Sequence, residues 1–294
     1  MHIDIILDSA GVSDTNLDGR TVLVTGSTSG IGRYAAEGFA ELGANVIIHG
    51  RNEKAGEEIV NKIQNNGGTA QFIECDFSEV SSVQSFVTDV QDTVDRLDIL
   101  VNNAGGFFTH TQPQDEEINY TFMVNHLASF IVTTELLPLL RSEESLGRIV
   151  NTSSSAHESA TYNPDQFTKN TNSWNAYCQS KLLNLIFAKY LSRTEPTIRS
   201  VAIHPGVIPG SGFARNLPSF IKPLGSILSR IPLVPIKKPQ SGSVPILYGA
   251  IHPNVKSGTY ITQTKEIPAK PEVDTTKIQE DLYEKSQSMY EQHD

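Results

Sequence analysis

A glycine-rich stretch near the amino terminus constrains the fold of this chain more than any other feature. The residues from 22 to 33 read Val-Leu-Val-Thr-Gly-Ser-Thr-Ser-Gly-Ile-Gly-Arg, so that Gly26, Gly30 and Gly32 follow a short apolar run. Apolar side chains at helical spacing continue to residue 42. The pattern predicts a buried strand, a tight turn and a helix. Such a junction offers backbone amides and a helix dipole to an anion such as a pyrophosphate, although a turn without a ligand would show the same pattern.

Alternating apolar runs and helical patterns extend from this stretch to the carboxyl terminus without a break in composition. They predict one α/β domain over residues 1–294, with residues 1–18 as an amino-terminal extension. We expect a doubly wound, Rossmann-type fold, in which about seven mostly parallel strands carry helices on both faces. Ligands of such sheets bind over the carboxyl ends of the strands. Polar residues that follow strands are therefore candidate site residues.

Charge and composition exclude several classes of partner. The chain has 23 basic and 33 acidic side chains, and its net charge of −10 repels nucleic acid and anionic membranes. The chain has no run of about 18 apolar residues, so the sequence predicts no membrane span. The two cysteines, Cys75 and Cys178, lack a disulfide or metal spacing, which favours free thiols and a cytoplasmic location. The eight histidines show no ligand spacing, so we expect no metal site.

The second and third strands, predicted at residues 45–49 and 70–74, end where a fold of this type chooses between two dinucleotide cofactors. A carboxylate at the end of the second strand would accept hydrogen bonds from ribose hydroxyls and would repel a 2′-phosphate. Gly50 stands at that position, and Arg51 follows with a planar fork suited to the phosphate. This favours NADP(H) over NAD(H), unless Arg51 is merely a solvated charge. At the end of the third strand, Asp76 either accepts from the adenine amino group or caps the helix that begins near Val80.

Polar residues also follow the next two predicted strands. One strand runs into residues 102–105, Asn-Asn-Ala-Gly, whose small side chains suit a backbone packed against a ligand. The other runs into serines at 153–155, which present hydroxyls above the sheet. Between them, a long helix is predicted over residues 116–140, bent near Pro138. Asparagine has poor propensity inside a helix, so Asn125 either caps a local kink or takes part in chemistry.

A tyrosine and a lysine lie one turn apart on a helix predicted over residues 174–191. Tyr177 and Lys181 are four positions apart, which places them on one face of that helix. A phenol titrates near pH 10 when unperturbed, and a nearby ammonium group or oxidised nicotinamide would stabilise its phenolate. The pair could therefore move a proton near working pH, although a tyrosine and a lysine at this spacing also occur by chance.

The order of these motifs resembles that of the short-chain dehydrogenase/reductase family over roughly residues 19–211. The long insert before the tyrosine, and the sequence Tyr-Cys-Gln-Ser-Lys that begins with it, are similar to the retinol-dehydrogenase-like and protochlorophyllide-reductase-like branch. The resemblance implies that Tyr177 exchanges a proton with the substrate and that Ser154 polarises the carbonyl. It also implies that Lys181 lies near the nicotinamide ribose and that Asn125 holds a relay water.

The resemblance further implies a cofactor site and an activity. The residues expected on the cofactor are Gly26, Ser27, Ser29, Gly30, Ile31, Gly32, Arg51, Asp76, Asn103, Ala104, Gly105, Tyr177, Lys181, Pro205 and Gly206. The implied activity is the NADP(H)-dependent interconversion of a carbonyl and an alcohol on an apolar small molecule. The alternatives are a cofactor-binding regulator or scaffold without turnover and a reductase of an activated carbon-carbon double bond. The long helices resemble those that pair subunits in the family, which implies a homodimer or homotetramer.

The segment after the strand predicted at 199–204 departs from the family. Pro-Gly-Val-Ile at 205–208 is similar to the family's segment beside the nicotinamide, but the usual threonine is missing, so Ser211 or the backbone would bond the carboxamide. Residues 211–240 are largely apolar and broken by prolines, which predicts a substrate flap or an ordinary packed pair of helices. His157 follows the serines and is expected to be a polar lining residue rather than a catalytic group.

Overall fold

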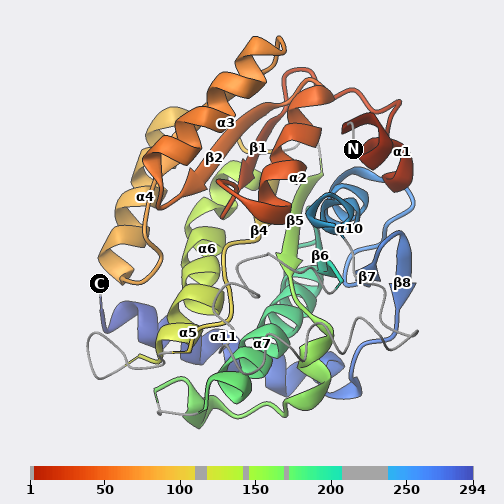
Figure 1. Cartoon of the computed structure of the whole chain (residues 1–294). Helices are drawn as coiled ribbons and strands as arrows, with labels where there is room; N and C mark the ends of the chain where they lie inside the picture. Colours follow the sequence, from red (N-terminus) through yellow and green to blue (C-terminus); the bar gives the residue numbers. More distant parts are fainter. Residues whose placement is uncertain (1–2, 110–117, 142–145, 169–171, 207–237, 294) are drawn as a thin grey trace.

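One β-sheet runs through the molecule and carries a layer of helices on each face (Figure 1). The structure, a computed structural model, describes residues 3–109, 118–141, 146–168, 172–206 and 238–293. In this part of the chain the sheet has eight strands, which are all parallel to their neighbours except the last pair. In sheet order they are β3 (Thr69–Glu74), β2 (Asn45–Gly50), β1 (Thr21–Val24), β4 (Ile99–Asn102), β5 (Gly147–Thr152), β6 (Ile198–His204), β7 (Tyr260–Thr262) and β8 (Lys265–Ile267).

Two apolar clusters fill the space between the sheet and its helices. One face is covered by α1 (Ile3–Ala10), α2 (Gly30–Glu41), α3 (Glu53–Asn65) and α10 (Pro239–Ile251). The other face is covered by α4 (Val80–Thr93), α5 (Tyr120–Phe122), α6 (Ala128–Leu140), α7 (Ser173–Thr194) and α11 (Thr276–Glu291). Short 3-10 turns lie at Ser155–Ser159, Pro164–Gln166 and Pro271–Asp274. Because parallel strands are buried on both faces, they show in the sequence as apolar runs.

The path of the chain reverses between β1 and β4. From β1 the chain winds outward through β2 and β3, then returns to β4 on the other side of β1 and continues outward through β5, β6 and β7. In such a sheet the loops after the two central strands lead to opposite faces and leave a crevice over the carboxyl ends of the strands. The glycine turn follows β1 and Asn103 follows β4, so the two motifs meet there. The predicted doubly wound α/β fold is confirmed.

The edge of the sheet differs from the prediction. Where about seven strands were expected, an eighth strand at 265–267 pairs antiparallel with β7 at 260–262, with Tyr260 opposite Ile267. Each of these strands has only 3 residues. Backbone pairing, rather than a run of apolar side chains, therefore defines them, and a sequence pattern cannot show it.

The amino-terminal extension folds onto the domain as helix α1. Its apolar residues Ile6, Leu7 and Ala10 lie on one side and are buried. The helix packs against α2 and α10, and it ends at Gly11, whose φ of 66° suits a residue after a helix terminus. The sequence predicted only an extension here, because a helix of 8 residues shows little periodicity.

The helix predicted over residues 116–140 is described from Tyr120 to Leu140 and contains a π-helical turn at Met123–Leu127. The interruption thus lies around Asn125, whereas Pro138 lies inside the last turns of α6. A π turn inserts an extra residue and is common at functional sites. Among the described helices, this one is long and apolar enough to cross a membrane, but 78% of its apolar window is buried inside the protein. The lack of a membrane span stays a prediction.

Candidate active site

The turn between β1 and α2 forms an open cradle at the crevice. Gly26 and Gly30 have φ angles of 64° and 62°, which side chains rarely adopt. A Cβ on Gly26 would lie 2.7 Å from the Ala104 Cα, whereas a Cβ on Gly30 would meet no atom within 4 Å. The Ser29 side chain makes no capping bond to the amides of α2. The first amides of the helix can therefore donate to a phosphate that approaches the turn.

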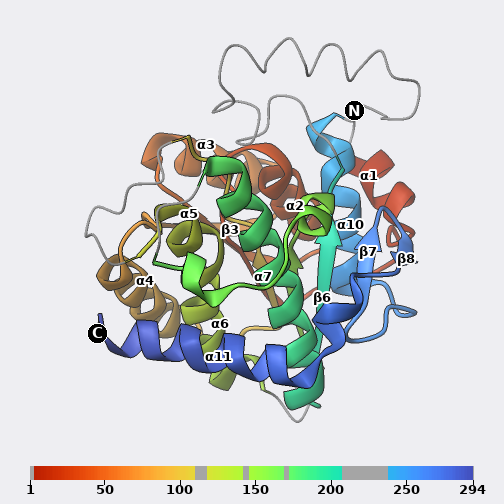
Figure 2. The ribbon, with the colours of Figure 1, turned by 90° about the horizontal axis from the view of Figure 1, so that it is seen from below.

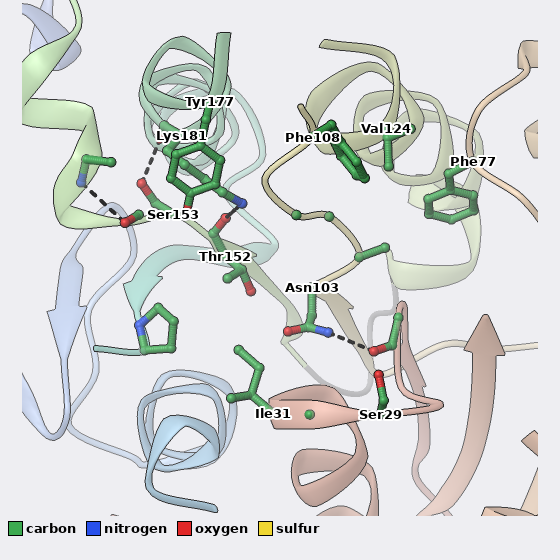
Figure 3. A pocket seen from close by; sticks show the side chains of 18 of the residues that line it. Ser29, Ile31, Phe77, Asn103, Phe108, Val124, Thr152, Ser153, Tyr177 and Lys181 are labelled. Atoms are coloured by element: carbon green, nitrogen blue, oxygen red, sulfur yellow. Dashed lines mark hydrogen bonds between the residues drawn. The ribbon is translucent and has the colours of Figure 1, made fainter. Parts of the chain in front are cut away.

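The Asn103 side chain ties the cradle to the end of β4. Its Nδ2 donates to the Thr25 carbonyl oxygen at 2.9 Å and to the Gly26 carbonyl oxygen at 3.1 Å; Figure 3 shows the Asn103 side chain at the turn. In return, the Thr25 hydroxyl oxygen accepts from the amides of Asn103 and Ala104 at 2.9 and 3.0 Å. These four bonds satisfy the backbone at the point where the two central strands end, and they fix the two loops relative to each other.

The far end of the cleft contains the residues predicted to contact adenosine. Arg51 Nη1 lies 3.3 Å from Asp76 Oδ2, and the two side chains are 59% and 46% exposed. Asp76 also accepts from the Ser78 amide at 3.0 Å. The residue that precedes helix α4 is Glu79, so the interpretation of Asp76 as a helix cap is wrong. A Cβ on Gly50 would lie 2.6 Å from Thr28 side-chain atoms, which leaves little room for a carboxylate there.

Helix α7 brings the proton-transfer residues to the other end of the cleft. Tyr177 is buried and its hydroxyl is hydrogen-bonded to the Ser154 side chain. Lys181 Nζ lies 5.7 Å from the centre of the Tyr177 ring and donates to the Thr152 carbonyl oxygen at 3.2 Å (Figure 3). Ser153 donates to the Lys181 carbonyl, which fastens the helix to the end of β5.

Burial is the main cause of the pKa shifts of Tyr177 and Lys181 in the protein without a bound cofactor. It raises the pKa of Tyr177 to about 12, although the bond with Ser154 lowers it. It lowers the pKa of Lys181 to about 8. The direction for Tyr177 is opposite to the one expected from a nearby ammonium group, because burial is the largest cause and disfavours the phenolate. An oxidised nicotinamide would add positive charge at this place and oppose the effect of burial.

Asn125 lies behind the cleft and clamps the loop that follows Gly105. Its Nδ2 donates to the Gly106 carbonyl and to the Ser180 hydroxyl, both at 2.9 Å. Its Oδ1 accepts from the Gly106 amide at 2.9 Å. A Cβ on Gly105 would lie only 2.7 Å from this oxygen. The side chain is thus fully engaged with the loop and with helix α7, so only its main-chain carbonyl could serve a relay.

One cleft of about 620 Å³ collects most of the predicted residues. The predicted residues that line it are Gly26, Ser29, Gly30, Ile31, Arg51, Asp76, Asn103, Ala104, Gly105, Ser154, Tyr177, Lys181, Pro205 and Gly206. Three others lie behind its surface: Ser27, Gly32 and Asn125. Ser27 was expected on the cofactor, but its hydroxyl donates to the Val24 carbonyl and accepts from the His49 amide, so it holds the turn from inside.

The sequence did not point to several residues that shape the cleft. Trp174 lines it one turn before Tyr177, with the two ring centres 6.2 Å apart. His49 Nδ1 accepts the Gly26 amide at 3.0 Å. His157, expected as a lining residue, lies behind the serine and donates from Nδ1 to the Ser154 carbonyl at 2.6 Å. Helical spacing from the tyrosine would have indicated Trp174, whereas nothing in the pattern indicated the role of His49.

Known proteins are similar to this chain in sequence and in fold. A model of the short chain dehydrogenase family matches residues 20–219. The chain belongs to the short-chain dehydrogenase/reductase family. Human retinol dehydrogenase 14 is 30% identical, with 93% of this chain and 87% of that protein covered. A crystal structure from Mycobacterium paratuberculosis is 26% identical with a TM-score of 0.75, covering 94% of this chain and 95% of that one.

Another solved relative bears on the cofactor. A Burkholderia cenocepacia short chain dehydrogenase in complex with NADP is 25% identical with a TM-score of 0.68, covering 84% of this chain and 97% of that one. The present chain is therefore a retinol-dehydrogenase-like member of a family of oxidoreductases that bind a nicotinamide cofactor and act on small molecules. The predicted membership and branch are confirmed.

The predicted flap lies largely outside the described residues. Val207, Ile208 and Ser211 belong to that part, together with residues up to 237. The last residues assigned to the flap, 238–240, are described, and they form the cap and the first turn of α10. That end of the segment is therefore a helix start packed on the domain.

Gly32 offers a test of the cradle. A Cβ there would lie 2.5 Å from both the Asn103 Nδ2 and the Gly26 carbonyl oxygen, so Gly32→Ala should disrupt the bridge between β1 and β4. We expect the affinity for NADPH, measured by fluorescence titration, to fall at least roughly tenfold. Gly67→Ala is the control: with φ at 86° and no atom near its Cβ, it should lose about 1 kcal/mol of stability. Equal NADPH affinity in both variants would contradict the cradle.

Proposed function

We propose that the protein is an NADP(H)-dependent oxidoreductase that interconverts a carbonyl and an alcohol on an apolar small molecule. The observation that carries the proposal is the meeting of Tyr177, Ser154 and Lys181 in one cleft with an open phosphate cradle. The tyrosine and serine hydroxyls are hydrogen-bonded to each other, so both can reach one substrate oxygen. If these three side chains were missing or lay far apart, the structure would favour a binding protein without turnover.

The geometry supports a division of labour among the three side chains. When bound, the cofactor supplies or accepts a hydride at its nicotinamide. In reduction, Ser154 donates a hydrogen bond to the carbonyl oxygen while Tyr177 transfers its proton to that oxygen, which leaves a phenolate and a new hydroxyl. Lys181 stabilises the phenolate electrostatically. Oxidation is the reverse and needs the phenolate at the start, so its rate should rise with pH.

Two features support the choice of NADP(H). The crowding of Gly50 against Thr28 disfavours a side chain at the position where a carboxylate would bind ribose hydroxyls. Arg51 is more than half exposed and is held loosely at 3.3 Å from Asp76, so its guanidinium can turn to a 2′-phosphate. The Burkholderia relative in complex with NADP is consistent with this choice.

The lining near Tyr177 supports an apolar substrate. Trp174 is 47% exposed at the edge of the cleft, and Phe108 also lines it. Such aromatic surface next to the proton donor would bury apolar groups of a ligand. The same proposal includes a cytoplasmic location without a membrane span, which the buried free thiols of Cys75 and Cys178 support.

A homodimer or homotetramer also remains part of the proposal. Pairing through α6 and α7 would have to accommodate α11, which runs across both helices (Figure 2). The Tyr283 ring of α11 lies 4.6 Å from that of Tyr190 and 5.3 Å from that of Phe130. A subunit that docked on this side would therefore meet α11 first.

Removal of the phenol hydroxyl tests the proposed chemistry. With NADPH and a panel of apolar aldehydes and ketones, Tyr177→Phe should lower kcat by roughly 10² to 10⁴. The affinity for NADPH should change little, because the ring and Lys181 remain. Tyr248→Phe, on α10 and outside the lining of the cleft, is the matched control and should keep wild-type turnover. Wild-type protein that binds NADPH but reduces none of the panel would instead favour a cofactor-binding regulator.

Cofactor choice is tested by removing the guanidinium. Arg51→Ala should weaken NADPH binding by about 1.5 to 3 kcal/mol, the contribution of a charge-assisted hydrogen bond, and should leave NADH binding nearly unchanged. Dissociation constants from protein fluorescence would give both numbers. Lys54→Ala removes an exposed cation nearby on α3 and serves as the control for general electrostatics. If Arg51→Ala weakened the binding of NADPH and NADH equally, the proposed role of Arg51 at the 2′-phosphate would be contradicted.

A further inference from the structure

Asn184 lies one helical turn beyond Lys181 on α7 and is 3% exposed. Its Nδ2 donates to the Asn125 main-chain carbonyl at 3.0 Å and to the Thr152 carbonyl at 3.1 Å. One amide group therefore joins the π turn to the end of β5. Since both partners are carbonyl oxygens, the side-chain orientation with the nitrogen toward them is the one that the network permits.

The Thr152 carbonyl is shared between two donors. Lys181 Nζ donates to it at 3.2 Å and Asn184 Nδ2 at 3.1 Å, so the ammonium group and the amide converge on one oxygen. A carbonyl oxygen has two lone pairs, which two donors can occupy from different directions. The amide thereby limits where the ammonium group can lie. This contact directly precedes the serines that follow β5.

A histidine fixes the orientation of this amide from behind. His126 Nδ1 lies 3.0 Å from Asn184 Oδ1, and because that oxygen only accepts, the ring nitrogen donates. Burial lowers the pKa of His126 to about 4, so the ring is neutral and its Nε2 is an acceptor. Ser286 on α11 has its hydroxyl oxygen 3.3 Å from this Nε2. The carboxyl-terminal helix α11 thus contacts the π turn through the His126 ring, and the ring in turn contacts Asn184.

We propose that Asn184 is a positioning residue that sets the location of Lys181 relative to Tyr177 by linking the Asn125 and Thr152 carbonyls. The proposal rests on the proposed function, because it assigns Asn184 to the same proton-transfer site. The π turn supplies the second part of the argument. An inserted residue disturbs the regular i to i−4 bonding of a helix, and Asn184 provides a donor from outside the helix to a carbonyl inside this turn.

Removal of the amide should act on catalysis through Lys181. Without it, the Asn125 carbonyl loses a buried donor, and Lys181 is free to move on the Thr152 oxygen. A small displacement of a catalytic group costs up to roughly 10²-fold in rate. A more distant ammonium group also stabilises the phenolate less, so the pH at which oxidation reaches half its maximum should rise.

The experiment compares Asn184→Asp, which keeps the size of the side chain, and Asn184→Leu, which is neutral, with wild type. We expect kcat to fall at least roughly tenfold, and the apparent pKa of the oxidation profile to rise by about one unit. Because Lys181 would also contact the nicotinamide half of the cofactor, NADPH affinity should fall, while affinity for the adenosine 2′,5′-bisphosphate fragment should not. This binding readout does not require turnover.

Gln279→Leu provides the matched control. Gln279 is a buried amide on α11 that donates to the Val273 carbonyl at 2.8 Å, away from the cleft. The Gln279→Leu substitution should lower the melting temperature and leave the pH profile of oxidation unchanged. The assignment is overturned if the Asn184 variants lose activity only in proportion to stability, as this control does, or if both fail to fold. Wild-type protein without turnover would instead contradict the proposed function, and the two binding titrations would still test the positioning role.

Discussion

The end of β1 and the end of β4 are held together by the half-buried side-chain amide of Asn103, and the site depends on it. Asn103 bonds the carbonyls of Thr25 and Gly26, while the Thr25 hydroxyl bonds the amides that follow β4. Without these bonds, two loops that leave the sheet on opposite faces would each need other partners for their backbone groups. These hydrogen bonds therefore fix the two loops relative to each other at the crevice where the chain reverses.

Side chains also hydrogen-bond main-chain groups at the catalytic end of the cleft, where buried donors bond carbonyl oxygens at the end of β5. Lys181 and Asn184 both donate to Thr152, and Ser153 donates back to the Lys181 carbonyl. Helix α7 is thus fastened to the sheet through polar contacts in an apolar surrounding, where an unmet donor or acceptor is costly. Both pKa shifts show that burial disfavours the charged forms of Tyr177 and Lys181. The hydrogen bonds of this network offset part of that cost.

Sequence patterns predicted the fold because buried parallel strands and amphipathic helices show distinct periodicities. They also predicted which polar residues follow the strands, whereas the family resemblance implied the roles of Asn125, Ser154, Tyr177 and Lys181. The eighth strand, at the edge of the sheet, was not predicted, because backbone pairing rather than an apolar run defines it. Asn184 was missed for another reason: its acceptors are carbonyls 59 and 32 positions away, and a sequence does not show which main-chain groups lack partners. Trp174 could have been found by helical spacing alone.

Hydride transfer to a carbonyl carbon is the central claim, and isotope transfer tests it most directly. NADPH carrying two deuterium atoms on C4 of the nicotinamide would be incubated with the wild-type protein and an apolar α,β-unsaturated ketone, and the product analysed by mass spectrometry and proton NMR. The account predicts an alcohol with one deuterium on the carbinol carbon and oxidised cofactor in equal amount. Deuterium on a carbon of a former double bond, or a bound cofactor that transfers none to any carbonyl, would contradict it.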